Sequence, residues 1–344
     1  MENAIDPAGP AKPQSMAAKR GIFPAIGLFF VAPLVAEFLL GNLPIKLLPA
    51  LVMLAPLYGG GALLIREMVR RTGRGWASIL ILGMAYAIFE EAFTTQSLFN
   101  PDYLKLNLGL LKPAFIPALG MGGWWTLWML NVHAVWSIAT PIALVEACVP
   151  DRARRPWLGR VGLVVTAILF LAGAVGSTAI GYKQDHFVSS GMQFTGAALV
   201  IVVLVGVAFF IPKAGSVRTQ GWVPAPWIVA ALALAFGSTA LLLPTRWGWG
   251  IFAALLALDF VMLALVLLWS RRVGWGVQHK LALAAGAALA YGWHAFMQHP
   301  AVGDLDKSVR VGNAIFLAGA IALIWFAARR TNAADASPAG VPMR

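Results

Sequence analysis

Two adjacent carboxylates, Glu90 and Glu91, interrupt one of the apolar stretches of this 344-residue chain. The run from Trp76 to Phe93 contains no other charged residue. A buried carboxylate costs several kcal/mol unless it is protonated, paired or bound to a metal, and two neighbours do not easily ionise together. The pair therefore predicts a site that handles a proton or holds a cation. The alternative is that both side chains make only interhelical hydrogen bonds.

A histidine on the next apolar stretch adds a second type of acid–base group. Residues three and four apart share a helix face, so Tyr86, Glu90 and Thr94 form one stripe. His133 and Ser137 form a matching stripe. We expect these stripes to meet in one polar cavity with groups from other helices. The residues expected to bind a substrate there are Glu37, Tyr86, Thr94, Gln96, Ser137, Tyr291 and Gln298.

Such a cavity could support two kinds of chemistry. Hydrolysis needs a base that accepts a proton near neutral pH, which a buried glutamate or histidine can supply. Glu90, Glu91 and His133 are therefore the expected catalytic residues. A divalent metal such as zinc needs nitrogen and oxygen ligands with one coordination position left open. The candidate metal ligands are Glu90, Glu91, His133 and His294.

The composition predicts an all-α fold, a polytopic bundle of about ten transmembrane helices. Hydrophobic residues make up 60% of the chain and charged residues 12%, and the mean hydropathy is +0.77. This leaves no room for a water-soluble domain of any size. A helix needs about 20 apolar residues to cross the hydrocarbon core of a bilayer. The candidate spans are 22–40, 48–65, 76–98, 123–148, 161–181, 194–212, 227–244, 249–269, 281–298 and 311–328.

The basic residues predict how these spans are oriented. With both termini in the cytoplasm, 19 of the 26 lysines and arginines fall on the cytoplasmic side, as the positive-inside rule requires. The net charge of +12 thus follows the topology and does not indicate a nucleic-acid partner. The expected location is the cytoplasmic (inner) membrane of a bacterium. The expected partners are the lipid bilayer and a membrane-embedded peptide or small-molecule substrate.

The polar residues divide the chain unevenly. A cytoplasmic N-terminal tail, 1–21, precedes the first four helices, 22–148, which carry most of the expected site. Six further helices, 149–328, follow, and the ninth helix overall contributes His294. A cytoplasmic C-terminal tail, 329–344, completes the chain. In this topology the polar groups fall in the outer half of the membrane, at one shared depth.

Other features have structural interpretations. The segment from Asn100 to Gly123 contains three prolines and cannot be one continuous helix, so we expect an outer loop that could act as a lid. Arg66 and Glu67 fall at a cytoplasmic helix end, where long side chains can extend into water. The glycines at the end of the second span are expected to allow close helix packing.

Two more acids have different expected roles. Glu146 lies close in sequence to the arginines of 152–155, which predicts an ion pair. Asp259 falls near the bilayer centre without an evident partner, and both a proton relay and an interhelical hydrogen bond fit it.

The glutamate pair and the following histidine resemble the motifs of the CAAX-processing and bacteriocin-processing (CPBP) intramembrane endopeptidases. The pattern of that family is EExxxR, then FxxxH, then HxxxN or HxxxD. This chain has both glutamates and His133, but Thr95 or Gln96 stands in place of the arginine. Met129 replaces the phenylalanine, and Ser137 replaces the final Asn or Asp.

The resemblance implies that Glu90 or Glu91 activates a water molecule, with assistance from His133, and that a peptide bond is cleaved in or near the membrane. His294 would then take the place of a second histidine. The expected site lies in the outer half of the membrane, whereas the best-known members of that family act on substrates that face the cytosol.

Two other functions fit some of the same residues. An enzyme is favoured because groups of different chemical types cluster at one depth. A proton-coupled small-molecule transporter would instead need acids spread across the membrane. The acids that could form such a relay are Glu37, Glu91, Asp259 and Glu146. A third function is haem binding, with His133 and His294 as the two axial ligands.

Overall fold

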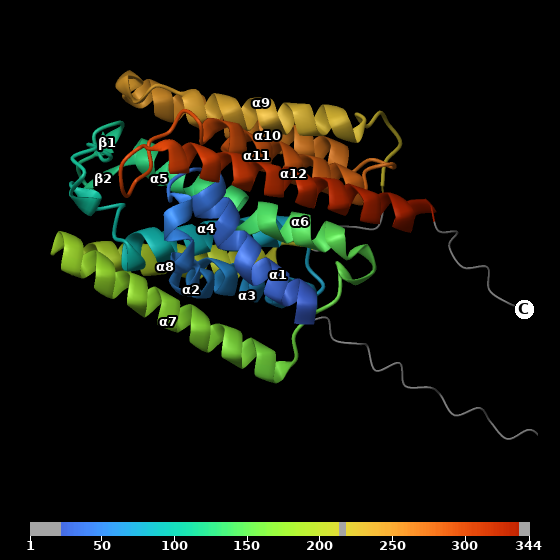
Figure 1. The fold of residues 1–344 in the computed structure, drawn as a ribbon, viewed down its shortest axis with the longest axis horizontal. Coiled ribbons are helices and arrows are strands. Elements are labelled where there is room, and N and C mark those ends of the chain that lie inside the picture. Colours follow the sequence, from blue (N-terminus) through green and yellow to red (C-terminus); the bar gives the residue numbers. More distant parts are fainter. Residues whose placement is uncertain (1–21, 213–217, 337–344) are drawn as a thin grey trace, which may run out of the picture.

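The computed structural model describes residues 22–212 and 218–336 and has the expected all-α fold. Long helices lie side by side, and the first and last described residues lie at the same end of the bundle (Figure 1). We call this the termini end. The opposite end carries a short β-hairpin, and we call it the hairpin end.

The first four helical segments are each built from several pieces, in which η marks a π-helix or a 3₁₀-helix. The first segment is α1 (Ile22–Pro33) with η1 (Leu34–Leu39), and the second is η2 (Ile45–Ala50), α2 (Leu51–Leu54), η3 (Ala55–Gly59) and α3 (Gly60–Arg71). The third is α4 (Trp76–Phe89) with η4 (Glu90–Thr94), and the fourth is α5 (Gly123–Asn131), η6 (Val132–Ala139) and α6 (Thr140–Cys148).

The later long helices are single α-helices. They are α7 (Arg160–Asp185), α8 (Gly191–Phe210), α9 (Pro226–Leu242), α10 (Trp249–Ser270), α11 (Val277–His294) and α12 (Lys307–Ala336). The connections contain the 3₁₀ turns η5 (Tyr103–Lys105), η7 (Pro150–Arg152) and η8 (Thr245–Trp247). They also contain the antiparallel pair β1 (Phe115–Ile116) and β2 (Met121–Gly122), in the segment that was expected not to be a continuous helix.

Each of the ten expected spans corresponds to a helical segment of the described chain. Eight of these segments are long and apolar enough to cross a membrane. The other two are α9, with 17 residues, and α11, with 18 residues and a polar first turn. The boundaries differ because helices continue past their apolar parts, as in Lys307–Ala336. Because α11 ends at His294, Gln298 lies in the following loop and not within the ninth span.

The two segments that carry the candidate site are the most buried of the eight. In their most apolar parts, 72% of the Gly123–Cys148 segment and 67% of the Trp76–Thr94 segment are buried inside the protein. The corresponding share is 17% for α7 and 11% for both α8 and α10. The third and fourth segments can therefore hold polar groups away from lipid, whereas α7, α8 and α10 expose apolar side chains.

Two glycines allow α4 to lie close to its neighbours. A Cβ atom on Gly61 would lie 2.5 Å from the ring of Tyr86, and one on Gly83 would lie 2.9 Å from Cα of Ala134. Both distances are shorter than real carbon contacts, so only glycine fits at these positions. This confirms the packing role expected for the glycines of the second span, and it brings α4 against η6.

Candidate functional site at the junction of the first four helical segments

Each of the first four helical segments contains one stretch of π-helix. These stretches are η1, η3, η4 and η6. Proline adjoins three of them: Pro33 precedes η1, Pro56 lies in η3, and Pro141 follows η6. Proline lacks the backbone N–H that an α-helix requires, which favours a local change in the hydrogen-bond ladder.

The π-helical stretches carry the polar residues of the site. Glu37 lies on η1, Tyr58 on η3, and both Glu90 and Glu91 on η4. His133 lies on η6, as does Ser137. Single π-helical turns inside α-helices occur frequently at functional sites. The irregular backbone is therefore concentrated where the chemistry-bearing side chains are.

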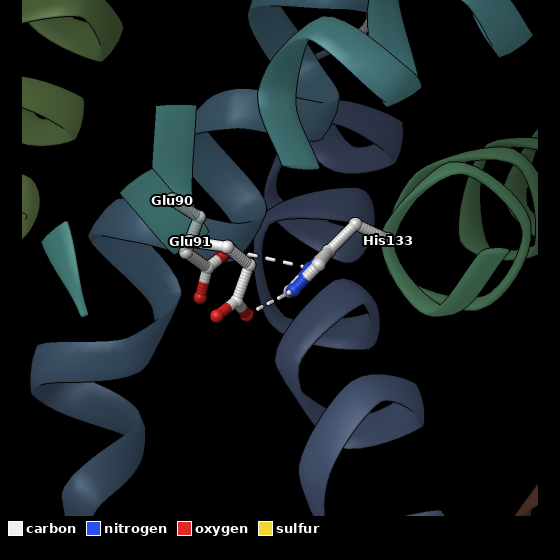
Figure 2. A group of neighbouring side chains, drawn as sticks. All are labelled: Glu90, Glu91 and His133. Carbon is white, nitrogen blue, oxygen red and sulfur yellow. Dashed lines mark hydrogen bonds and ion pairs between the residues drawn. The ribbon is translucent and has the colours of Figure 1, made fainter. Parts of the chain in front are cut away.

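The imidazole of His133 lies between the carboxylates of Glu90 and Glu91 (Figure 2). Its Nε2 is 2.7 Å from Oε1 of Glu91, and its Nδ1 is 3.3 Å from Oε2 of Glu90. All three side chains are buried, with at most 6% of any of these residues exposed. The structure thus brings together the three residues expected to be catalytic.

Glu91 is held by several donors. The hydroxyls of Thr95 and Ser97 both donate to its Oε2, the former at 2.8 Å, while the imidazole lies at Oε1. The Ser97 hydroxyl in turn accepts a hydrogen bond of 3.0 Å from Nε1 of Trp125. Gln96 has a left-handed φ of 56°, which ends the helix and turns Ser97 back toward Glu91. These surroundings suit an ionised carboxylate, which only accepts hydrogen bonds.

Glu90 is less completely bonded than Glu91. Its Oε2 is buried and has no hydrogen-bond partner in the described part of the chain, because the approach of His133 is an ion-pair contact without hydrogen-bond geometry. The hydroxyl of Thr94 is also buried and unpartnered there, and the buried hydroxyl of Tyr86 lies beside Glu90. The expected stripe of Tyr86, Glu90 and Thr94 is therefore a row of polar atoms that can still accept a ligand.

Aromatic rings form the walls around His133. The ring of Tyr58 stacks on the imidazole at a centroid distance of 6.2 Å, and the ring of Tyr86 meets it edge-on at 5.7 Å. Oγ of Ser137 lies 3.3 Å from Nδ1 of His133. The hydroxyl of Tyr58 donates a hydrogen bond of 2.6 Å to Oε1 of Glu37. Tyr58 is thus a site residue that sequence reasoning missed, although its hydroxyl in an apolar stretch was a visible signal.

Glu37 and Gln298 belong to a second polar chain. Nδ2 of Asn42 donates to Oε2 of Glu37 at 3.2 Å, and the amide of Gln298 donates to Oδ1 of Asn42. Glu37 is partly exposed. Tyr58 therefore connects the buried site around His133 to a more accessible group of polar side chains.

The structure places Tyr291 and His294 away from the glutamate pair. Tyr291 stacks on Trp136 with ring centroids 4.6 Å apart, so α11 packs on the face of η6 that carries Trp136. His294 follows Tyr291 by one turn, and it is not part of the ligand group formed by the glutamates and His133. The structure leaves this expected fourth metal ligand outside the group.

Gln96 also faces away from the catalytic candidates. Its Oε1 accepts a hydrogen bond of 2.7 Å from the backbone N–H of Ser189. This bond ties the end of η4 to the connection that precedes α8. Gln96 thus has a structural bond in this arrangement, and its expected contact with a substrate stays a prediction.

The charges near the termini end correct one expectation. Arg66 and Glu67 are fully buried and do not extend into water. Nε of Arg66 lies 3.0 Å from Oε1 of Glu146, and Nη2 of Arg70 lies 2.7 Å from Oε2 of the same glutamate. Glu146 thus forms an ion pair, but not with the arginines of 152–155. Backbone carbonyls of the loop after α6 also accept hydrogen bonds from Arg66, so this loop covers the charges.

Glu90, Glu91 and His133 can each offer one ligand atom, and these atoms lie within 4.8 Å of one another. Two carboxylate oxygens and one imidazole nitrogen make the number of protein ligands found in a catalytic zinc site. The imidazole bonds directly to Glu91, so this contact would have to open for a cation to bind. The same donors can also move protons between themselves without a metal.

Residues 28–339 match the model of a family described as an uncharacterized membrane protein family, and the chain belongs to that family. The matching family is not the CPBP endopeptidases, so the resemblance to them is one of local motif. No curated protein and no solved structure matches the chain. The protein is therefore a multi-pass integral membrane protein.

Proposed function

We propose that this protein is an intramembrane hydrolase that cleaves a bond next to a carbonyl group in a membrane-embedded substrate. The observation that carries the proposal is the unequal bonding of the two glutamates. Glu91 is surrounded by donors, whereas Glu90 keeps a buried oxygen without a hydrogen bond beside His133. A general base must lie within hydrogen-bond reach of the proton that it removes. Glu90 is the carboxylate with a free position for a water molecule.

In the proposed reaction Glu90 takes a proton from water while the water oxygen attacks the carbonyl carbon. His133, protonated at the start, gives a proton to the leaving group as the bond to the carbonyl carbon breaks. A protonated imidazole can donate from both nitrogens, and Glu91 compensates its charge. The proton on Glu90 then returns to Nδ1 of His133, which lies 3.3 Å from Oε2, once the imidazole turns into hydrogen-bond geometry. The site thereby regains its initial protonation state.

The motif resemblance supports an endopeptidase as the form of this hydrolase. Thr95 stands where the CPBP pattern has an arginine, and it donates a hydrogen bond to Glu91. The neutral hydroxyl of Thr95 thus takes the place of the charged arginine, and Glu91 keeps a hydrogen-bond donor at this position. We further propose that the protein lies in a bacterial cytoplasmic membrane with both termini inside, which places the site near the outer surface.

Proton-coupled transport is supported less well by the positions of the acids. Asp259 accepts a hydrogen bond of 2.8 Å from Asn131, which fits the interhelical hydrogen bond that was one of its two expected roles. Glu146 is held by Arg66 and Arg70. A relay needs acids that can change their protonation in turn, whereas Glu146 is engaged in ion pairs with two arginines.

Divalent cation binding is a separate proposal for the same three side chains. Their donor set suits zinc, with one coordination position left open for water. Titration of the purified protein with Zn²⁺ should then show one binding event that disappears in His133→Ala. Binding that persists in this variant would contradict a zinc site here.

The proposed function can be tested in cells of the native host. Mass spectrometry of the terminal peptides of membrane proteins should reveal cleavage products with the wild-type chain. These products should be absent with Glu90→Gln and with His133→Ala, because each variant removes a proton-transfer group. Asp259→Asn is the matched control, and it should leave the products unchanged. A transporter would be favoured by two results together. The cleavage products would be unchanged in a Glu90→Gln/Glu91→Gln double variant, and Asp259→Asn would abolish the cellular activity of the protein.

A further inference from the structure

An open groove lies between the end of the α4–η4 segment and α7. Its volume is about 460 Å³, which is in the range of roughly 300–1,000 Å³ typical of ligand pockets. Phe89, Phe93 and Thr94 line one side, and α7 from Leu171 to Tyr182 lines the other. Because α7 is mostly unburied within the protein, the groove opens toward the lipid-facing surface.

One polar atom links this groove to the candidate active site. Thr94 lines the groove, is only 2% exposed, and has a buried hydroxyl without a hydrogen-bond partner in the described chain. It lies four residues after Glu90 on the same π-helical stretch, so both belong to one stripe. An occupant of the groove therefore contacts Thr94, one helical turn from Glu90.

The polar atom lies at one end of the groove. A Cβ atom on Gly181 would lie 3.9 Å from the backbone oxygen of Thr94, which places Thr94 level with the Tyr182 end. Phe89 contacts Phe170 with ring centroids 5.4 Å apart, which marks the deeper end. The groove is thus polar near the hairpin end and apolar further into the membrane.

The dimensions of the groove decide what fits in it. From Leu171 to Tyr182 the helix rises by about 16 Å at ~1.5 Å per residue. This equals about half of the ~30 Å hydrocarbon core, the depth that one lipid chain fills in one leaflet. A groove of this length and volume suits one extended hydrocarbon chain.

An extended peptide does not fit the chemistry of the lining. Each of its residues would bring an N–H and a C=O that need partners inside the membrane. The hydroxyl of Thr178 already donates to the carbonyl of Ala174. The free hydroxyl of Thr94 can serve one polar group of a ligand, but not a repeating backbone.

We propose that the groove binds a single long hydrocarbon chain of the substrate, with the polar group at the end of that chain beside Thr94 and Glu90. The inference rests on the proposed hydrolase function and names its substrate class, a carbonyl compound whose lipid chain occupies the groove while any peptide part of it lies outside the groove. The bond to be cleaved then lies near the end of the chain, at the level of the glutamate pair.

The binding step can be tested separately from hydrolysis. The probe is palmitic acid that carries a photoactivatable diazirine, added to the purified full-length protein in lipid nanodiscs. Mass spectrometry should find saturable labelling of the peptides around 89–94 and 171–182, and excess unlabelled palmitic acid should compete with it. Ala179→Trp fills the groove from an exposed position, and it should reduce this labelling at least about tenfold.

The matched control is Ala172→Trp, which changes an exposed alanine of the same helix that does not line the groove. It should label as the wild type does. Equal labelling in both tryptophan variants, or labelling that does not saturate, would overturn the groove proposal. Glu90→Gln should keep the labelling but lose hydrolysis. Labelling without any hydrolysis in the wild type would contradict the enzyme and leave the groove intact.

Discussion

Glu90 and Glu91 are neighbours in the sequence, but adjacent residues of a helix point in different directions. Glu91 meets the hydroxyls of Thr95 and Ser97, whereas Glu90 shares its stripe with the hydroxyls of Tyr86 and Thr94. The imidazole of His133 contacts both carboxylates. The two acids therefore have different tasks in this account: one holds and balances the histidine, and the other acts on water.

This difference predicts unequal effects on stability. Glu91→Gln should lower the free energy of unfolding by about 1.5–3 kcal/mol, because hydrogen bonds to a charged acceptor are lost or weakened. Glu90→Gln should cost less, because Oε2 of Glu90 makes no hydrogen bond in the described chain that the substitution could remove. Thermal unfolding of both variants in detergent checks this. Equal shifts in the two midpoints would contradict the assignment of roles.

The sequence was enough to identify Glu90, Glu91 and His133 as site residues. An ionisable group in an apolar stretch is costly to bury, whichever neighbours the helix has. The uncharged members were harder to identify. Asn42 looks like an ordinary loop residue, and Tyr58 shows only a hydroxyl in an apolar stretch, until the structure reveals their bonds to Glu37. His294 was expected among the metal ligands, but it lies outside the group formed by Glu90, Glu91 and His133. The prediction used its depth in the membrane, and depth does not determine which face of a helix packs against the site.

At the scale of elements, the burial of Arg66 and Glu67 depends on a loop. Position at a helix end suggested exposure to water, but the loop after α6 accepts hydrogen bonds from Arg66 and covers the ion pairs. Nothing local in the sequence indicates that this loop folds over α3. The π-helical stretches were also beyond prediction, because hydrophobic periodicity does not distinguish a single widened turn.

The covered ion pairs should be important for stability. Arg66→Gln leaves Glu146 with one arginine and Glu67 without its closest partner, and breaking a buried ion pair typically costs about 3–5 kcal/mol. Lys46→Gln is the control, because Lys46 pairs with Asp306 at the exposed surface, where ion pairs contribute little. Chemical unfolding in detergent should show a large loss for the first variant and no measurable loss for the second. A similar midpoint for both variants would contradict the importance of the buried network.

At the scale of the whole molecule, hydropathy was sufficient to find the ten long helical segments of the described chain, because the length needed to cross a bilayer leaves a clear signal. Which helices lie next to each other was not predictable. The contact of α4 with η6 depends on Gly83, whose small size matters only once its neighbour Ala134 is known. The distribution of lysines and arginines predicts which end of the bundle faces the cytoplasm. The structure alone does not supply this orientation.

Topology reporters test that orientation. Fusions within 152–160 should report the cytoplasm, and fusions within 100–122 should report the opposite side, because most basic residues lie with the former. Fusions near the end of α12 serve as the control and should agree with 152–160. Reversed signals would place the glutamate pair near the cytoplasmic surface and would leave the chemistry of the site unchanged.

The most direct test of the central claim is the transfer of oxygen from water to product. Purified protein in nanodiscs is incubated with a lipid and membrane-protein extract of the host in water enriched in ¹⁸O. Hydrolysis should place one ¹⁸O atom in each new carboxyl group, which mass spectrometry detects. Glu90→Gln should lower the rate of this labelling by about 10²- to 10⁴-fold, as is common when a general base is removed, while Asp259→Asn should keep it. Labelling at the wild-type rate in Glu90→Gln would contradict the role of this glutamate as the base.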